Sequence, residues 1–227
     1  MDLLEDIAQE HQLFDRAAGS LLALTDEWIK NNDLETRKEA EKFCNFFEKV
    51  MIQFHTPKEE KLVFPFLEKL NIPRDKGPLF YYELEHKEQI KSIETIRSYT
   101  QKNVFTEDEK GELKKLAEKF CSEIWEHIDK EDSVLMSEVK ERIRGSLLMD
   151  LNTEYQNYLA ANQVDEGLTT EIGLLIKKYP PVEMLPDVFR GDGCMSCRHF
   201  GEGCQGIEHE WWTEHEWEDF FARNNRD

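Results

Sequence analysis

Residues 55–60 are His55-Thr56-Pro57-Lys58-Glu59-Glu60, and the pattern returns in residues 127–132 as His127-Ile128-Asp129-Lys130-Glu131-Asp132. A histidine and a glutamate four residues apart lie on one face of a helix, one turn from each other. A Glu-His pair precedes each motif, ending at His11 in the first case and at His86 in the second. Two halves of the chain therefore carry the same metal-ligand types in the same order, which predicts a two-metal site built on helices.

Apolar residues recur at helical spacing through the first 142 residues, with no strand signal. Thr106-x-x-Glu109 is a capping box that opens the last of the helices, and Pro57 and Pro65 predict kinks in the second. The pattern indicates an all-α, up-down-up-down four-helix bundle with the two halves related by a pseudo-two-fold axis through the site. The predicted helices are Leu3 to about Ile29, Leu34 to about Leu70, Leu79 to about Gln101, and Glu107 to about Arg142.

We place the metal-binding bundle in residues 1–144, because Gly145-Ser146 interrupts the last pattern. Residues 145–227 are predicted to form a C-terminal extension. It contains two shorter helices, predicted at Leu147–Asn162 and Leu168–Tyr179. The helical pattern is lost from Leu185 onward, a Cys-rich loop follows at Gly191–Cys204, and a Trp-rich terminal helix is predicted at about Glu208–Arg223.

The charge of the chain limits its partners. A formal net charge of −19 argues against binding to nucleic acid or to an anionic membrane surface, since both need a basic face. No apolar run is long enough to span a bilayer, and the acidic start lacks the basic residues of a secretory signal, so we expect a cytoplasmic protein. Cys44 and Cys121 lie in apolar helical stretches and are predicted to be buried free thiols.

The four histidines border the apolar faces of their predicted helices. Any one of them alone is most simply a hydrogen-bonded core residue. Four imidazoles and two carboxylates buried together would carry a large desolvation cost, which a bound metal removes. Imidazole and carboxylate together suit iron, manganese or zinc, and a helical bundle with shared carboxylates favours iron. The His-Glu-x-x-His motif of hydrolytic zinc sites is absent from the sequence.

In the order, type and spacing of these residues, the chain resembles the hemerythrin-like (HHE cation-binding) family over about residues 1–143. The resemblance implies a four-helix bundle that holds a non-haem di-iron centre with an open position for dioxygen. It implies that Glu59 and Glu131 bridge the irons, with Asp132 as the alternative to Glu131, because some hemerythrins place this acid five residues after the histidine. The terminal ligands that it implies are His11, His55, His86 and His127.

The chain departs from oxygen-carrying hemerythrins, which have a further histidine one turn before the position of His86. Tyr82 stands there, and Ile7 stands at the equivalent position before His11. Thr56 replaces the second histidine that often follows the position of His55. Fewer ligands imply more open coordination, a Tyr82 phenolate ligand or weaker metal binding. The departure favours sensing, storage or redox chemistry over reversible oxygen carriage.

The leading interpretation is a di-iron protein that binds dioxygen or a related small oxidant. One alternative is a di-iron enzyme that reduces peroxide or nitric oxide, or an iron donor for iron–sulfur cluster repair. Another is a sensor whose C-terminal tail transmits the signal. Reversible spectral change with oxygen, consumption of peroxide or nitric oxide, and redox-dependent proteolysis of the tail distinguish these functions.

Cys194, Cys197 and Cys204 lie among glycines near the C-terminus. With His209 or His199 as fourth ligand they form a candidate zinc knuckle. An iron–sulfur cluster is an alternative, but the segment lacks the usual fourth cysteine. A thioredoxin-like redox pair is another, but the strand–helix setting of such a pair is not evident. The remaining alternative is that the three thiols bind nothing. The aromatic residues that follow are expected to pack on the bundle or to bind a protein partner; they are Trp211, Trp212, Trp217, Phe220 and Phe221.

Overall fold

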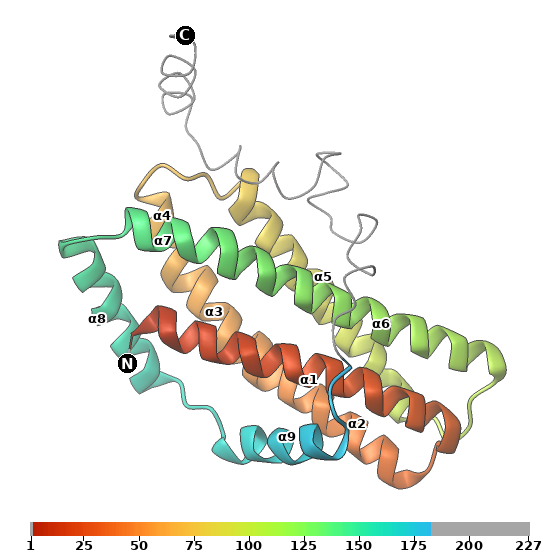
Figure 1. The fold of residues 1–227 in the computed structure, drawn as a ribbon. Coiled ribbons are helices and arrows are strands. Elements are labelled where there is room, and N and C mark those ends of the chain that lie inside the picture. The colour runs from red at the N-terminus through yellow and green to blue at the C-terminus, as the bar shows by residue number, and fades with distance from the viewer. Residues whose placement is uncertain (1, 183–227) are drawn as a thin grey trace.

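The structure is a computed structural model that describes residues 2–182 of the 227-residue chain. The regular secondary structure of the described residues is helical throughout, without a strand, and forms an elongated helical bundle (Figure 1). The predicted site of Cys194, Cys197, Cys204 and His209 (or His199) and the predicted Trp-rich helix lie outside the described residues. The zinc and partner predictions made for them remain predictions.

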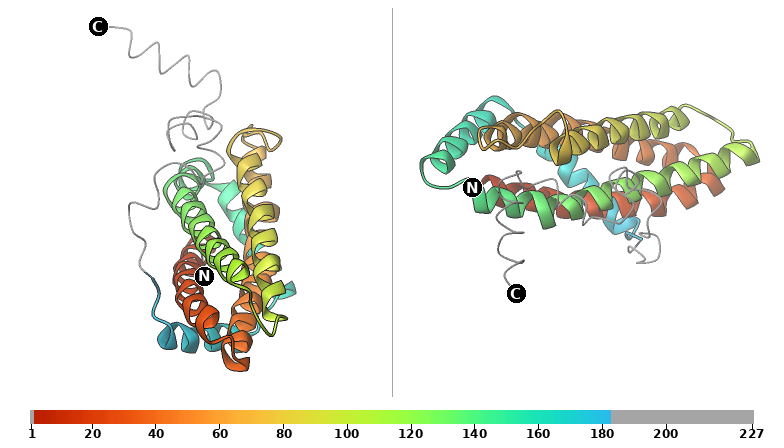
Figure 2. Two further views of the ribbon diagram at one scale, coloured as in Figure 1. Left: turned by 90° about the vertical axis from the view of Figure 1, so that its right-hand side faces the viewer. Right: turned by 90° about the horizontal axis from the view of Figure 1, so that it is seen from above.

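The helices of the bundle form four rods. The first and the last rod along the chain lie against each other. Helix α1 contacts α2 and α6, and α5 also contacts both (Figures 1 and 2). The first half of the bundle consists of α1 (Leu3–Asn31) and a composite rod of α2 (Leu34–Phe46), η1 (Phe47–His55), α3 (Thr56–Lys58), η2 (Glu59–Val63) and α4 (Phe64–Glu68). The second half consists of α5 (Gly77–Thr100) and a rod of α6 (Glu107–Lys130), η3 (Glu131–Leu135) and α7 (Met136–Arg142).

Local sequence signals explain where the rods begin and end. The side chain of Asp2 accepts a hydrogen bond from the backbone N–H of Leu4 at the start of α1. That helix ends at Asn31 and is followed by Asn32 in the left-handed conformation. At the start of α6 the predicted capping box is confirmed, because Thr106 and Glu109 each accept the other's backbone N–H.

Three segments of the rods are π-helical, with hydrogen bonds to the carbonyl five residues back. Thr56 and Phe64, each directly before a proline, donate to Met51 and Glu59 respectively. The rod thus passes Pro57 and Pro65 as an unbroken run of helical segments. Proline is not the general cause, because η3 contains none and Met136 still donates to Glu131. In both halves a π segment starts at the glutamate of the His-x-x-x-Glu motif, as is common at functional sites.

The buried apolar residues form two clusters along the bundle. The larger cluster contains Phe14, Met51 and Ile124, and the smaller contains Ile7 and Val63. Phe14, Met51, Ile124 and Ile7 each lie three or four residues from a motif histidine, and Val63 lies four residues after Glu59. The polar residues of the motifs therefore lie between the clusters.

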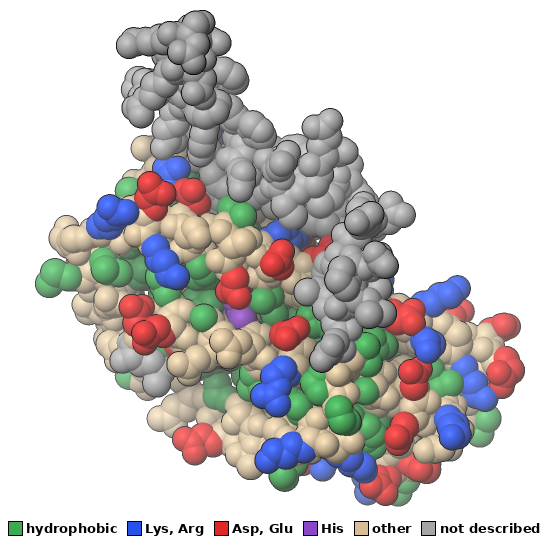
Figure 3. Space-filling view, in the orientation of Figure 1, with side chains coloured by type: hydrophobic (Ala, Val, Ile, Leu, Met, Phe, Trp, Pro, Cys, Tyr) green, Lys and Arg blue, Asp and Glu red, His purple; other side chains and the backbone are tan. Residues whose placement is uncertain are grey.

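Residues 146–182 pack onto the bundle and share its core. Tyr155 of α8 (Ser146–Ala161) joins the smaller cluster, and Ile172 and Ile176 of α9 (Glu166–Lys178) join the larger one. Charged side chains of both signs are interspersed over the face shown in Figure 3. No helix within residues 2–182 is long and apolar enough to cross a membrane. Cys44 and Cys121 are buried free thiols, as predicted, and burial raises the pKa of Cys44 to about 12.

Candidate metal centre

All four rods contribute to one buried group of imidazoles and carboxylates. His11 lies on α1 and His86 on α5, while His55 and His127 come from the composite rods. Glu59 and Glu131 follow one turn later, each as the first residue of a π segment. The two carboxylates are 0% exposed, and no histidine of the group is more than 5% exposed. The six residues that the sequence predicted as ligands therefore meet in the interior.

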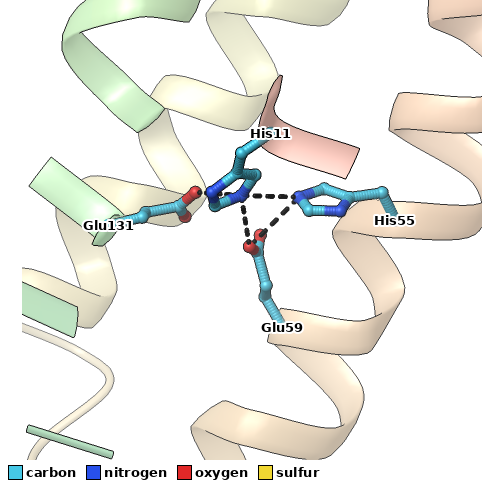
Figure 4. A group of neighbouring side chains, drawn as sticks. All are labelled: His11, His55, Glu59 and Glu131. Atoms are coloured by element: carbon cyan, nitrogen blue, oxygen red, sulfur yellow. Dashed lines mark hydrogen bonds and ion pairs between the residues drawn. The ribbon is translucent and has the colours of Figure 1, made fainter. Parts of the chain in front are cut away.

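The six side chains form two overlapping groups. His11 and His55 make one group with the two glutamates, and His86 and His127 make the other with the same two glutamates. Within each group one ligand atom from every residue lies within 4.8 Å of the others. Figure 4 shows the first group, with the four side chains directed toward a common centre. Because Glu59 and Glu131 belong to both groups, they are placed to be shared between two ions.

The donor atoms of these groups fit metal ions. The Nε2 atoms of His11 and His55 face each other at 3.2 Å, and those of His86 and His127 at 3.0 Å. Both carboxylate oxygens of Glu59, and both of Glu131, are buried without a hydrogen-bond partner among the described residues. Imidazole nitrogens lie 3.2 to 3.9 Å from these oxygens. Buried carboxylates are normally hydrogen-bonded or bound to metal. Because these carboxylates have no hydrogen-bond partner among the described residues, their geometry favours metal binding.

Each histidine is oriented by a carboxylate on the side away from the centre. In each case the Nδ1–H group donates to a carboxylate oxygen over 2.8 to 2.9 Å. The pairs are His11 with Asp132, His55 with Glu10, His86 with Glu60, and His127 with Glu85. A carboxylate only accepts hydrogen bonds, so Nδ1 carries the proton and Nε2 is left to bind a metal. Such partners fix ring orientation and raise ligand basicity in metal sites.

The family model of the hemerythrin HHE cation-binding domain matches residues 2–139. The chain belongs to this hemerythrin family. The match ends within α7, so it covers the bundle and all six predicted ligands but neither α8 nor α9. Neither the curated proteins nor the solved structures that were compared with the chain gave a match.

The histidines and glutamates of this hemerythrin domain shift one another's pKa values. Burial alone would lower the pKa of His86, but contacts with Glu59 and Glu60 outweigh it and raise that pKa to about 10. Burial and the neighbouring Glu59 would raise the pKa of Glu131, but His127 and His11 bring it down to about 2. Each imidazole therefore favours the ionised form of the neighbouring glutamates, and each glutamate raises the pKa of the neighbouring imidazoles.

Asp132 and Tyr82, the two alternative ligands predicted from the sequence, lie outside both groups. The side chain of Asp132 is 48% exposed and accepts from His11 Nδ1. The hydroxyl of Tyr82 donates to the backbone carbonyl of Lys130. In the hemerythrin domain these residues support or border the ligands.

The sequence reasoning missed a lysine in each half. Glu10 uses its second oxygen to accept from Lys58 Nζ at 2.7 Å, and Glu85 accepts from Lys130. Both lysines are buried, and Lys58 also donates to Asp6 at 2.5 Å. The repeat itself is the signal that could have identified them. Lys58 and Lys130 each follow the histidine of their motif by three residues, and Glu10 and Glu85 directly precede His11 and His86.

The carboxylates behind the histidines should tune metal affinity. Asp132→Ala and Glu60→Ala are expected to weaken metal binding roughly 10- to 100-fold, because they remove the acceptors that orient His11 and His86. Asp129→Ala is the matched control, since Asp129 lies in the same motif and is exposed. Competition of each purified variant against a chelator measures the affinity. Equal affinities for Asp132→Ala and Asp129→Ala would refute the assigned role.

Proposed function

We propose that the domain holds two iron ions and binds dioxygen or a related small oxidant next to them. Each ion would be held by two histidines and by Glu59 and Glu131, which the two ions share. The proposal includes the up-down-up-down connectivity of a four-helix bundle, which the contacts of α1 and α5 with both α2 and α6 support. It also includes a cytoplasmic location, supported by the free thiols of Cys44 and Cys121.

The observation that carries this function is the pair of fully buried glutamates without hydrogen-bond partners, shared by two histidine pairs. Mixed nitrogen and carboxylate donors in a helical bundle are typical of paired iron ions. A ligand set of two histidines and two shared carboxylates leaves coordination positions for a small molecule. Two irons held by these residues would supply electrons to a small oxidant.

The chain contributes more than ligands. Phe14, Met51, Ile124 and Ile128 lie beside the histidine rings and keep bulk water from the centre. The four outer carboxylates hold the imidazoles in the orientation that directs Nε2 inward. A dry, pre-oriented site favours a small, weakly polar ligand over water and limits side reactions of what binds there.

Metal analysis of the full chain, purified without chelator, tests the proposal. About two irons per chain are expected, with an absorbance spectrum that changes on admission of oxygen and returns on its removal. Steady consumption of peroxide or nitric oxide would instead favour the enzyme. A folded, metal-free protein that takes up no iron from solution, or that takes up only zinc, would contradict the proposal.

A further inference from the structure

Gln89 is a buried amide that the metal centre does not use. It lies on α5, about one turn after His86, and is 2% exposed. Its side-chain Nε2 has no hydrogen-bond partner within the described part of the chain. An amide donor left unpaired in the interior destabilises the fold, so its presence calls for a ligand that pairs with it.

A small cavity lies beside Gln89 and the histidines. Gln89 lines this cavity of about 10 Å³ together with the rings of His11, His55, His86 and His127. A space of this size holds about one water-sized group. The cavity lies between the histidine rings and the larger hydrophobic cluster, because Phe14, Met51 and Ile124 of that cluster also line it. A small ligand in this space would be surrounded by the histidines, by apolar side chains, by Thr56 and by the amide of Gln89.

The two halves of the bundle differ at this position. Gln89 follows His86 by three residues, whereas Phe14 occupies the equivalent position after His11. Both line the cavity, so these equivalent positions present an amide in one half and an aromatic ring in the other. Thr56 of the first half also lines the cavity, and its counterpart in the second half is Ile128. The ligand sets are symmetric but the cavity is not, and a diatomic ligand would experience different surroundings at its two ends.

We infer that Gln89 donates a hydrogen bond through Nε2–H to the outer atom of a small ligand bound in this cavity, and so selects ligands whose outer atom is an acceptor. This inference rests on the proposed function. The ligand class is a diatomic with an oxygen at its outer end. Gln89 is a specificity-determining residue in this role, because it faces the bound molecule without holding the metal.

Gln89→Met tests the inference, since methionine keeps the length of the side chain and removes the donor. Nitric oxide is the probe for the iron-loaded full chain. In the wild type, hydrogen bonding to its oxygen lowers the N–O stretching frequency; in Gln89→Met that frequency should rise and the dissociation constant should increase roughly fivefold. The matched control is Gln12→Met, which changes an exposed glutamine on α1 and should leave both values unchanged.

A second measurement uses metal-free protein. Because the unpaired amide is unfavourable in the interior, Gln89→Met should raise the melting temperature, whereas a glutamine with a structural partner would give a lower one. Iron content is determined first for every variant. Failure of the wild type to take up iron overturns the proposed function. The melting temperature of the metal-free protein does not depend on iron uptake, so it tests the inference about Gln89 separately. An iron-loaded protein that binds no nitric oxide, an N–O frequency unaffected by Gln89→Met, or a lowered melting temperature overturns the inference about Gln89.

Discussion

Replacing Glu59 or Glu131 with glutamine is expected to remove metal from both positions at once. Each glutamate belongs to both ligand groups, so one substitution would withdraw an oxygen ligand from each of the two proposed ions. The amide nitrogen that replaces it cannot bind a cation and would face imidazole nitrogens. Loss of an oriented outer partner costs 10- to 100-fold in affinity, and loss of a shared ligand should exceed about 100-fold. Iron per chain should fall from about two to near zero in elemental analysis.

Glu94→Gln is the control for this experiment, because Glu94 is an exposed acid on α5. It should retain the metal content of the wild type. Circular dichroism of the metal-free variants establishes that the helices remain. Retention of one tightly bound iron in Glu59→Gln or Glu131→Gln would show that the two positions do not share these carboxylates.

Lys58→Met should have the largest effect on folding. The ammonium group is completely buried, and it donates to the carboxylates of Asp6 and Glu10. Its removal leaves two largely buried acids without their cation, and loss of one partner from a buried ion pair costs about 3 kcal/mol or more. The hydroxyl of Tyr155 on α8 also donates to Asp6, so the contact of α8 with the bundle should weaken as well. Urea unfolding of the metal-free protein measures the change.

Lys42→Met is the matched control. Lys42 pairs with Glu171 across the surface between α2 and α9, and both side chains are about 40% exposed. Exposed pairs contribute at most about 1 kcal/mol. Lys130→Met, the equivalent change in the second half, should resemble Lys58→Met, because Lys130 is buried against Glu85. A Lys58→Met protein as stable as Lys42→Met would disprove the assigned contribution of the buried network.

The features predictable from the sequence are those that depend on short separations along the chain. Helical periodicity located the rods, and the Thr106–Glu109 capping box closes between residues three apart. The pairing of His55 with Glu59, and of His127 with Glu131, follows from one turn of helix, and their Nε2–Oε1 distances are 3.2 Å in both halves. The π-helical segments were not predicted, since η3 has no proline to signal it.

By itself, then, the sequence determined the helices, the family and the six residues that meet at the centre, because each signal is local or is repeated in the two halves. Only the tertiary structure decided which acid of Glu131 and Asp132 points inward. Adjacent residues on a helix differ by about 100° in direction, so the rotation of the rod against its neighbours makes that choice. The same long-range packing pairs Asp132 with His11 and brings Gln89 and Phe14 to one cavity, contacts that no spacing along the chain specifies.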